Sequence, residues 1–221
     1  MGAIIFDLNG TLVDSERAHW MAYHEVLSEY RIDFTFEEFS EDWTCHGRDL
    51  EDMLRKHGRE DLTAQAAALK LKKDEVFSSS MIQHIRVMPG AAEAVQRLSK
   101  EFVLAVDSTS KKDDVVRILS TFGLEGYFKV IGSCDMPWDS KRYGKNSKSS
   151  RFRSIADTLC SDPSRCLVVG DAEKDVRAAK LNNMSVIIVP TETTRNNDFA
   201  KADLVLSSLR DLTTEIVRTV L

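Results

Sequence analysis

The fold of this 221-residue chain is decided by the stretch Phe6-Asp7-Leu8-Asn9-Gly10-Thr11-Leu12-Val13-Asp14-Ser15. It continues the apolar run that begins at Ala3, and such a short, continuous run is typical of a buried parallel strand. An acidic residue directly after the strand, followed by Gly10 and Thr11, places a carboxylate on a tight turn whose backbone N–H groups can face an anion. The same residue types are common in ordinary turns, so the stretch alone also fits a strand end with a solvated Asp7.

Outward from this stretch, the chain predicts an α/β fold that is interrupted by helices. Residues 15–85 have the spacing of successive helices, expected near 16–30, 50–57 and 62–77, with no convincing strand. Strands and helices then alternate. Strands are expected at 102–106, 129–132, 166–169, 185–189 and 203–206, and helices near 91–100 and 111–122. We therefore expect a Rossmann-like, doubly wound parallel sheet built from 1–14 and 86–221, with an all-helical domain inserted at 15–85.

Composition narrows the class of protein. Hydrophobic residues make up 43% of the chain and charged residues 29%, as in ordinary globular proteins. The formal net charge is −5 and no long basic run occurs, which argues against a nucleic-acid partner. The four cysteines lack metal-ligand spacing, and no apolar stretch has the length of a bilayer span or the pattern of a secretion signal. We expect a cytoplasmic protein with reduced thiols, a small-molecule substrate and no membrane partner; the sequence does not indicate an oligomeric state.

Two further strand ends carry polar side chains, and ligands of such sheets bind at the carboxyl ends of the strands. Gly170-Asp171 and Asp175 stand at a strand-to-helix junction, where two carboxylates four residues apart can face a hard cation that prefers oxygen ligands. They could instead complement the helix dipole. Ser108 follows the strand expected at 102–106, where a hydroxyl can donate to a phosphate oxygen. The run 108–110 could equally be a helix N-cap.

Together these motifs resemble the haloacid dehalogenase-like (HAD) superfamily, whose first motif reads Asp-x-Asp-Gly-Thr and whose fourth reads Gly-Asp-x-x-x-Asp. The resemblance implies a Mg²⁺-dependent hydrolase with Asp7 as its nucleophile. It implies a metal site formed by Asp7, the backbone carbonyl of Asn9, Asp171 and Asp175. It also implies a phosphate cradle formed by Gly10, Thr11, Ser108 and Thr109.

The family also needs a lysine, because its charge offsets the negative charge of nucleophile and phosphate together. The usual form is Lys-Pro-x-Pro before a helix, and this chain has no such proline pattern. Lys145 is slightly favoured, because its separation from Asp171 is within one residue of the usual separation in the family. Lys148 is the alternative, with a shorter loop that leads directly into a helix near Arg151. Either lysine could also be an ordinary exposed loop residue.

Asn9 departs from the family, which has at this place an aspartate that protonates the leaving group and then activates water. An amide donates a hydrogen bond but cannot transfer a proton at neutral pH, and such a loss costs roughly 10²–10⁴-fold in rate. Three interpretations of Asn9 compete: an engineered substitution, a natural low-activity or binding variant, or a reaction that needs no acid at this place. Members that cleave carbon–halogen or carbon–phosphorus bonds also depart from Asp. The former lack the acids of the fourth motif, and the latter need a cap lysine that is missing near His46.

In family members with a helical insertion at this point, the insertion closes over the site as a cap and contributes a specificity loop. Trp43 to Arg48 resembles that loop, so His46, Gly47 and Arg48 are expected to contact the substrate. Arg48 could instead pair with Glu51 or Asp52. We expect Trp20 and Trp43 to belong to the core of the insertion rather than to stack on a ligand.

The sequence therefore predicts a Mg²⁺-dependent phosphatase of a small phosphorylated metabolite, acting through an aspartyl-phosphate and slowed by Asn9. A HAD-like protein that binds phosphate esters with negligible turnover is the alternative from another class. A hydrolase of carbon–phosphorus or carbon–halogen bonds is a further one. The hypothesis requires that Asp7 and Asp171 meet at one edge of the sheet, close enough to share a cation.

Overall fold

In the computed structural model, which describes residues 2–45 and 48–221, the chain forms two compact units. One contains residues 1–14 and 87–221, and the other residues 15–86. The α/β unit contains β1 (Ala3–Asp7), β2 (Val13–Asp14), α5 (Ala91–Leu98), β4 (Val103–Asp107), α6 (Lys112–Thr121), β5 (Phe128–Gly132), α7 (Ser140–Tyr143), α8 (Lys148–Thr158), β6 (Cys166–Gly170), α9 (Glu173–Lys180), β7 (Ser185–Ile188), β8 (Leu204–Val205) and α10 (Thr214–Val220).

The α/β unit is built on a six-stranded sheet of parallel strands in the order β5-β4-β1-β6-β7-β8. Because β1 lies between β4 and β6, its carboxyl end is next to the ends of both strands. The register pairs Asp7 of β1 with Asp107 of β4. The expected Rossmann-like fold class is confirmed, and each expected strand lies within two residues of an observed one.

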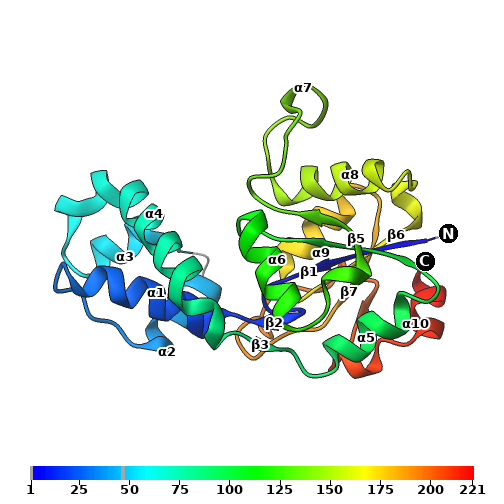
Figure 1. The fold of residues 1–221 in the computed structure, drawn as a ribbon, viewed down its shortest axis with the longest axis horizontal. Coiled ribbons are helices and arrows are strands. Elements are labelled where there is room, and N and C mark those ends of the chain that lie inside the picture. Colours follow the sequence, from blue (N-terminus) through cyan, green and yellow to red (C-terminus); the bar gives the residue numbers. More distant parts are fainter. Residues whose placement is uncertain (1, 46–47) are drawn as a thin grey trace. The chain divides into compact units, whose positions relative to one another are not determined.

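Helices cover both faces of this sheet, with α8 and α9 on one side and α5 and α10 on the other (Figure 1). In α5 the buried residues Ala91, Ala94, Val95 and Leu98 recur at helical spacing, which gives the helix one apolar face. The face under α8 and α9 is packed by Phe152 and Ile155 of α8 against strand residues such as Ile5. Apolar packing therefore fixes the sheet, and the polar residues are left at its carboxyl edge.

The other unit is helical: α1 (Glu16–Ser28), α2 (Phe36–Phe39), α3 (Leu50–Lys56) and α4 (Ala66–Val76) surround one apolar core. A π-helical segment, Ser40–Cys45, follows α2, and a second, Phe77–Met81, follows α4. The sequence did not predict helix between 36 and 45. Trp20 and Trp43 pack against the core of this unit, as expected. At its boundary the short strands β2 and β3 (Arg86–Val87) pair in a separate two-stranded sheet.

The stretch after β5 differs from the sequence expectation. Residues 137–150 are rich in serine, lysine and turn-forming residues, a composition that predicts an irregular segment, but they contain α7 and the first turn of α8. In α7 the Asp139 side chain accepts from the backbone N–H groups of Lys141 and Arg142, so this short helix is capped locally. Helix α8 begins at Lys148, three residues earlier than the helix expected near Arg151.

Candidate active site

Three carboxylates meet at the carboxyl edge of the sheet. Asp7 ends β1, while Asp171 and Asp175 lie directly after β6 and in the first turn of α9. All three are buried, and each offers an oxygen that lies within 4.8 Å of those of the other two. The arrangement that the sequence hypothesis requires is therefore present in the structure.

Two glycines make room for these acids. Gly10 has φ of +84°, and a Cβ there would lie 2.6 Å from Asp171 Oδ2. A Cβ on Gly170 would lie 2.6 Å from Asp175 Cβ. Any other residue at either place would displace a carboxylate, and at position 10 it would also strain the turn. The motif glycines are therefore needed for the geometry of the acid cluster.

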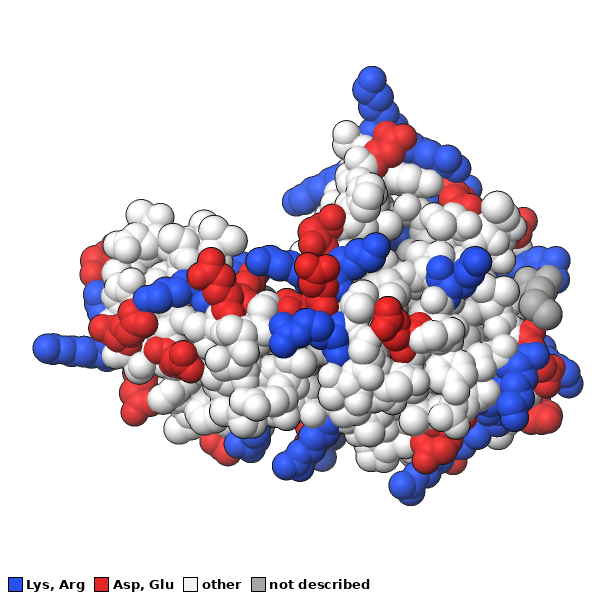
Figure 2. Space-filling model, in the orientation of Figure 1, with Lys and Arg blue, Asp and Glu red and all other residues white. Residues whose placement is uncertain are grey.

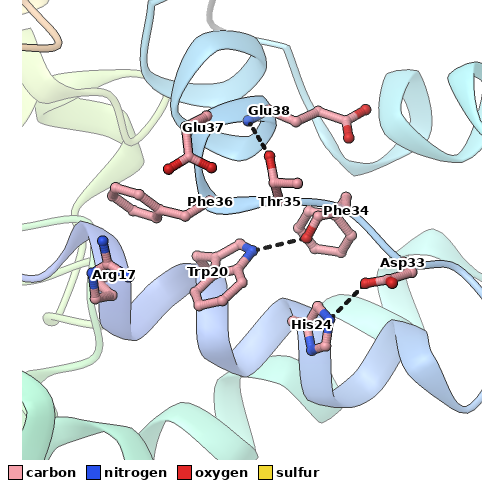
Figure 3. Close-up of a pocket in the computed structure, with 9 residues that line it drawn as sticks. All are labelled: Arg17, Trp20, His24, Asp33, Phe34, Thr35, Phe36, Glu37 and Glu38. Carbon is pink, nitrogen blue, oxygen red and sulfur yellow. Dashed lines mark hydrogen bonds and ion pairs between the residues drawn. The ribbon is translucent and has the colours of Figure 1, made fainter.

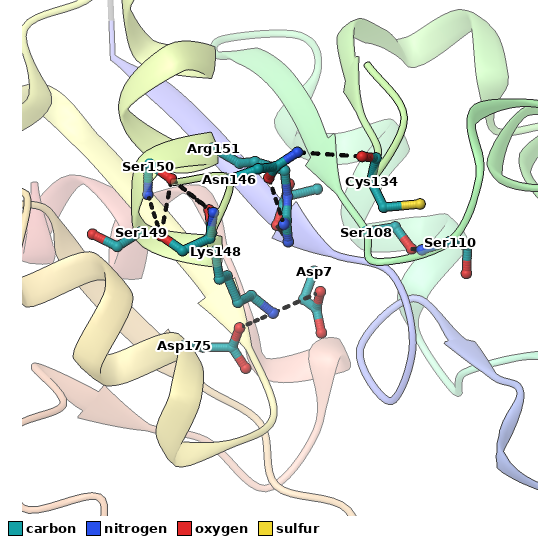
Figure 4. A network of polar contacts seen from close by, with 12 residues as sticks. Asp7, Ser108, Ser110, Cys134, Asn146, Lys148, Ser149, Ser150, Arg151 and Asp175 are labelled. Carbon is teal, nitrogen blue, oxygen red and sulfur yellow. Dashed lines mark hydrogen bonds and ion pairs between the residues drawn. The ribbon is translucent and has the colours of Figure 1, made fainter. Parts of the chain in front are cut away.

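Lys148 is the cation at the centre of the cluster. Its Nζ lies 2.9 Å from Asp7 Oδ1 and also forms an ion pair with Asp175, as Figure 4 shows. Lys145 is exposed. The slight preference for Lys145 was therefore wrong, because the count from Asp171 assumed a conventional loop, whereas the chain inserts α7 and starts α8 at Lys148.

Burial and like charge dominate the electrostatics of the cluster. Burial, with the charges of Asp175 and Asp7, raises the pKa of Asp171 to about 7. Burial also raises the pKa of Asp175, against the attraction of Lys148. Burial by itself would lower the pKa of Lys148, but Asp175 and Asp7 outweigh it and the pKa is raised. Three buried acids thus surround one lysine, and this excess of negative charge suits a divalent cation.

The hydroxyls near the cluster are held by local contacts. Ser108 is buried, and its Oγ accepts from the backbone N–H of Ser110 at 3.1 Å. It is not a helix N-cap, because α6 begins at Lys112 after Lys111. Thr109 is exposed. Thr11 is buried and its hydroxyl donates to Asp171 Oδ1 at 3.4 Å.

Asn9 lies in the turn after β1 and is half-buried. The turn is closed by backbone hydrogen bonds, including Gly10 N–H to the Val13 carbonyl at 2.8 Å, and Asn9 forms a bridge with Val13. Only Leu8 separates it from Asp7, so position 9 lies at the edge where the acids meet. The metal-ligand role of its carbonyl remains a prediction.

A buried ion pair beside the cluster was missed by the sequence reasoning. Arg151 Nε and Nη2 donate to the two carboxylate oxygens of Asp107 at 2.7 and 3.0 Å. Burial raises the pKa of Asp107, while the hydrogen bonds and charge of Arg151 oppose this shift. The sequence feature that could have indicated it is Asp107, an aspartate at the end of an apolar strand. At that strand end the sequence analysis assigned a function only to Ser108.

In the helical unit, the predicted substrate contacts are only partly within the described residues. His46 and Gly47 lie outside them. Arg48 forms an ion pair with Asp42, and its backbone N–H donates to the Asp42 carbonyl. The alternative pairing with Glu51 or Asp52 is wrong, because Arg55 takes both of those carboxylates.

The helical unit also has a surface groove of about 460 Å³ (Figure 3). Its polar groups contact one another: Trp20 Nε1 donates to the Phe34 carbonyl at 3.2 Å, and His24 pairs with Asp33. Arg17 lies over the Phe36 ring, 4.2 Å from its centroid. None of the acids of the cluster lines this groove, so the chemistry of the two places is separate.

On the face of the molecule shown in Figure 2, basic and acidic side chains are interspersed. Within residues 2–45 and 48–221, every helix is too short or too polar to traverse a bilayer. Among the described residues, Cys134, Cys160 and Cys166 are not in disulfide bonds.

A comparison with known proteins defines the class that this fold and site represent. Residues 4–189 match the family model of the haloacid dehalogenase-like hydrolases, so the chain belongs to that family, and the resemblance found in the sequence is confirmed. The chain is 28% identical over 219 residues to "Protein CbbY" of Cereibacter sphaeroides, covering 95% of this chain and 93% of the relative. It is 27% identical over 183 residues to a phosphoglycolate phosphatase of Aquifex aeolicus, covering 81% and 80%.

Solved structures agree with the fold. CbbY from Rhodobacter sphaeroides, in a mutant form in complex with xylulose-(1,5)bisphosphate, has a TM-score of 0.76 at 26% identity and covers 96% of each chain. A β-phosphoglucomutase of Clostridium difficile has a TM-score of 0.78 at 22% identity, covering 99% of this chain and 96% of that one. The second likeness concerns the fold alone.

Proposed function

We propose that this protein is a Mg²⁺-dependent phosphatase of a small phosphorylated metabolite, and that it acts through an aspartyl-phosphate on Asp7. The observation that carries this proposal is the meeting of Asp7, Asp171 and Asp175 around Lys148. A buried nucleophile beside a cation, among further acids, suits attack on a phosphate whose charge must be balanced. The phosphatase relatives support the substrate class, and phosphorylated sugars are the first compounds to test.

In the first step, a carboxylate oxygen of Asp7 attacks phosphorus and the bond from phosphorus to the ester oxygen breaks. Lys148 contacts Oδ1, so we assign the attack to Oδ2. The leaving oxygen departs with the bonding electrons and takes up a proton. Water then attacks phosphorus, the acyl-phosphate bond breaks, and inorganic phosphate and the Asp7 carboxylate are released.

Other residues of the cluster bind and balance charge. Lys148 offsets the negative charge of the nucleophile and phosphate, while Ser108 and Thr109, with the turn at Gly10 and Thr11, form the phosphate cradle. Asp7, Asp171, Asp175 and the Asn9 carbonyl would hold Mg²⁺, which when bound neutralises phosphate oxygens. The three buried carboxylates fit this ion, because they offer hard oxygen ligands with excess negative charge.

Asn9 sets the rate in this proposal. Its amide can donate a hydrogen bond to the leaving oxygen, but the proton must come from water. Turnover is therefore slow, and fastest for esters with good leaving groups. The same residue favours a second candidate function, a protein that binds phosphate esters and turns over negligibly.

The helical unit is assigned the role of cap, with His46, Gly47 and Arg48 as its substrate contacts. Support for this assignment comes from its position in the chain, between β2 and β3, and from the fold of the relatives. Arg48→Ala is expected to raise KM more for a phosphate ester that carries a second anionic group than for one whose phosphate is its only anionic group. An equal change for both substrates would remove Arg48 from the proposal.

The test is hydrolysis of a panel of phosphate esters with Mg²⁺, with one phosphonate and one 2-haloacid included. Asp7→Ala is expected to abolish phosphate release, because the nucleophile is lost. Asp113→Ala is the matched control, since Asp113 is an exposed carboxylate in the first turn of α6 and should leave the rate unchanged. Binding of esters without any turnover would favour the binding protein, and turnover of the phosphonate or haloacid alone would favour the other hydrolases.

Restoring the acid gives the sharper result. Asn9→Asp is expected to raise kcat by roughly 10²–10⁴-fold, because a carboxyl group can protonate the leaving oxygen and then activate water. The aspartyl-phosphate should persist longer in the protein with Asn9 than in the Asn9→Asp variant. Intact-mass measurement after rapid quenching detects it as one added phosphoryl group. If Asn9→Asp leaves kcat unchanged, the role given to position 9 is wrong.

A further inference from the structure

Helix α8 is joined to the sheet edge by a buried ion pair that the proposed chemistry does not use. Asp107 is fully buried, and the Arg151 side chain is 5% exposed. Two N–H groups of Arg151 donate to the two oxygens of Asp107. This bidentate (two-pronged) geometry fixes the orientation of the guanidinium group as well as its distance from the carboxylate. Asn146 Oδ1 also accepts from Arg151, and Asn146 Nδ2 donates to the Cys134 carbonyl (Figure 4).

This pair lies next to the contact between Lys148 and the nucleophile. Lys148 and Arg151 are three residues apart on α8, so both side chains leave the same side of its first turn. Their partners, Asp7 and Asp107, are register neighbours on β1 and β4. Two cations of one helical turn therefore contact two adjacent carboxylates of the sheet edge.

The first turn of α8 has other polar anchors. Ser147 and Ser150 form a reciprocal capping box, and Asn182 Nδ2 donates to the Ser149 carbonyl at 2.8 Å. The sequence lacks Lys-Pro-x-Pro, and Ser149 and Arg151 stand where its prolines would follow Lys148. Proline pre-sets the backbone at a helix start. Here the same turn is held by side-chain contacts instead.

We propose that the Asp107–Arg151 pair positions Lys148 by clamping the first turn of α8 to β4. A lysine side chain is long and flexible, so its placement at Asp7 depends on where the helix begins. Arg151 is thus a positioning residue that acts through Lys148. Asp107 does not replace the acid missing at position 9, because both of its oxygens are taken by Arg151. The proposal rests on the phosphatase function, in which Lys148 binds phosphate.

The test removes the clamp without changing the net charge. The double variant Asp107→Leu/Arg151→Met leaves no buried charge unpaired, and such replacement is often neutral for stability. Inorganic phosphate is titrated into the Mg²⁺-saturated protein by calorimetry, in the original background and in Lys148→Met. The control is Glu101→Leu/Arg218→Met, which removes an ion pair between α10 and the segment that precedes β4.

We expect the clamp variant to weaken phosphate affinity about tenfold in the original background and less than about twofold in Lys148→Met. The control should change neither value. Unchanged affinity in the clamp variant would overturn the inference and leave the phosphatase proposal intact. Equal losses in both backgrounds would also overturn it, because the pair would then not act through Lys148.

Two further outcomes are decisive. If Lys148→Met binds phosphate as tightly as the original protein, the phosphate site itself is wrong, and the inference fails with it. If circular dichroism shows that the clamp variant does not fold, Arg151→Lys replaces it, since it keeps the charge and loses the two-pronged geometry. An affinity loss of about threefold is then expected, and no loss would overturn the inference.

Discussion

Among the described residues, two lysine side chains are less than about 15% exposed, one in each unit, and their surroundings differ. Lys148 in the α/β unit contacts the carboxylates of Asp7 and Asp175. Lys73 in the helical unit lies over the rings of Tyr23 and Phe77, 5.0 and 4.9 Å from their centroids, with His19 Nδ1 at 2.9 Å from its Nζ. Their exposed side-chain fractions are similar, 13% and 7%.

The difference between their surroundings distinguishes a lysine of a candidate active site, Lys148, from a lysine of a structural core, Lys73. Aromatic faces and an imidazole stabilise a buried ammonium, and Asp74 at 3.2 Å balances its charge locally. Around Lys148 the acids outnumber the cation, and such an excess is costly unless a ligand completes it. The surplus of buried charge, rather than burial of a lysine, therefore marks the place where chemistry is expected.

Among the tests of this contrast between the two lysines, removal of the lysine of the site has the largest expected effect. Lys148→Met should lower kcat/KM for phosphate esters by roughly 10²–10³-fold, because one charged donor to the transition state is lost. The matched control is Lys145→Met, the exposed lysine that the sequence count favoured, and it should stay within about twofold of the original protein. Initial rates with saturating Mg²⁺ measure both. A larger loss in Lys145→Met than in Lys148→Met would reverse the assignment of the lysine.

A second test uses the surplus charge directly. Mg²⁺ at about 100 times its dissociation constant should stabilise the folded protein by about 2.7 kcal/mol and raise Tm by roughly 5–10 °C. Asp171→Asn should raise Tm in the metal-free protein, because it removes the cost of burying the Asp171 charge and the repulsion of that charge by Asp175 and Asp7. The same variant should lose most of the increase given by Mg²⁺. Scanning calorimetry with and without Mg²⁺ measures both the Tm change caused by the substitution and the Tm change caused by Mg²⁺. An undiminished increase of Tm by Mg²⁺ in Asp171→Asn would place the ion elsewhere.

The strand ends were predictable from the sequence, because local pattern and chemistry agree there. Apolar runs that end in Asp7 or in Gly170-Asp171 determine both the strand and the position of the acid, and parallel strands bring their carboxyl ends to one edge. The family motifs then identified the class of hydrolase. The fold and the acid cluster could both be predicted for this reason.

The segment between β5 and α8 could not be predicted in the same way. The position of Lys148 depends on α7, on the capping box at Ser147 and on the Asp107–Arg151 pair, and none of these has a periodic signature. The ion pair joins residues 44 positions apart, so only the packed sheet reveals it. Counting residues back from Asp171 failed because loop length, unlike strand length, is not set by packing.

The smallest expected effect concerns the other lysine, through its neighbour His19. Burial lowers the pKa of His19 well below 6.5, and the charges of Lys73 and Lys70 lower it further. The folded protein therefore stays unprotonated at His19 when the unfolded chain takes up a proton. Its stability should fall as the pH drops below about 6.5, by up to about 1.4 kcal/mol per pH unit, and this contribution is absent above that pH.

Urea unfolding between about pH 7.5 and pH 5.5 checks the sign. His19→Gln keeps a hydrogen-bond acceptor for Lys73 but does not titrate, so it should lose about 1 kcal/mol less stability over this interval than the original protein. Lys73→Met should give an intermediate loss, because one of the charges that depress the His19 pKa is removed. Equal losses in all three proteins would mean that His19 titrates alike in the folded and unfolded chains. The two lysines would then not differ in the way described, since Lys73 would contact an imidazole that takes up protons as readily as an imidazole in water.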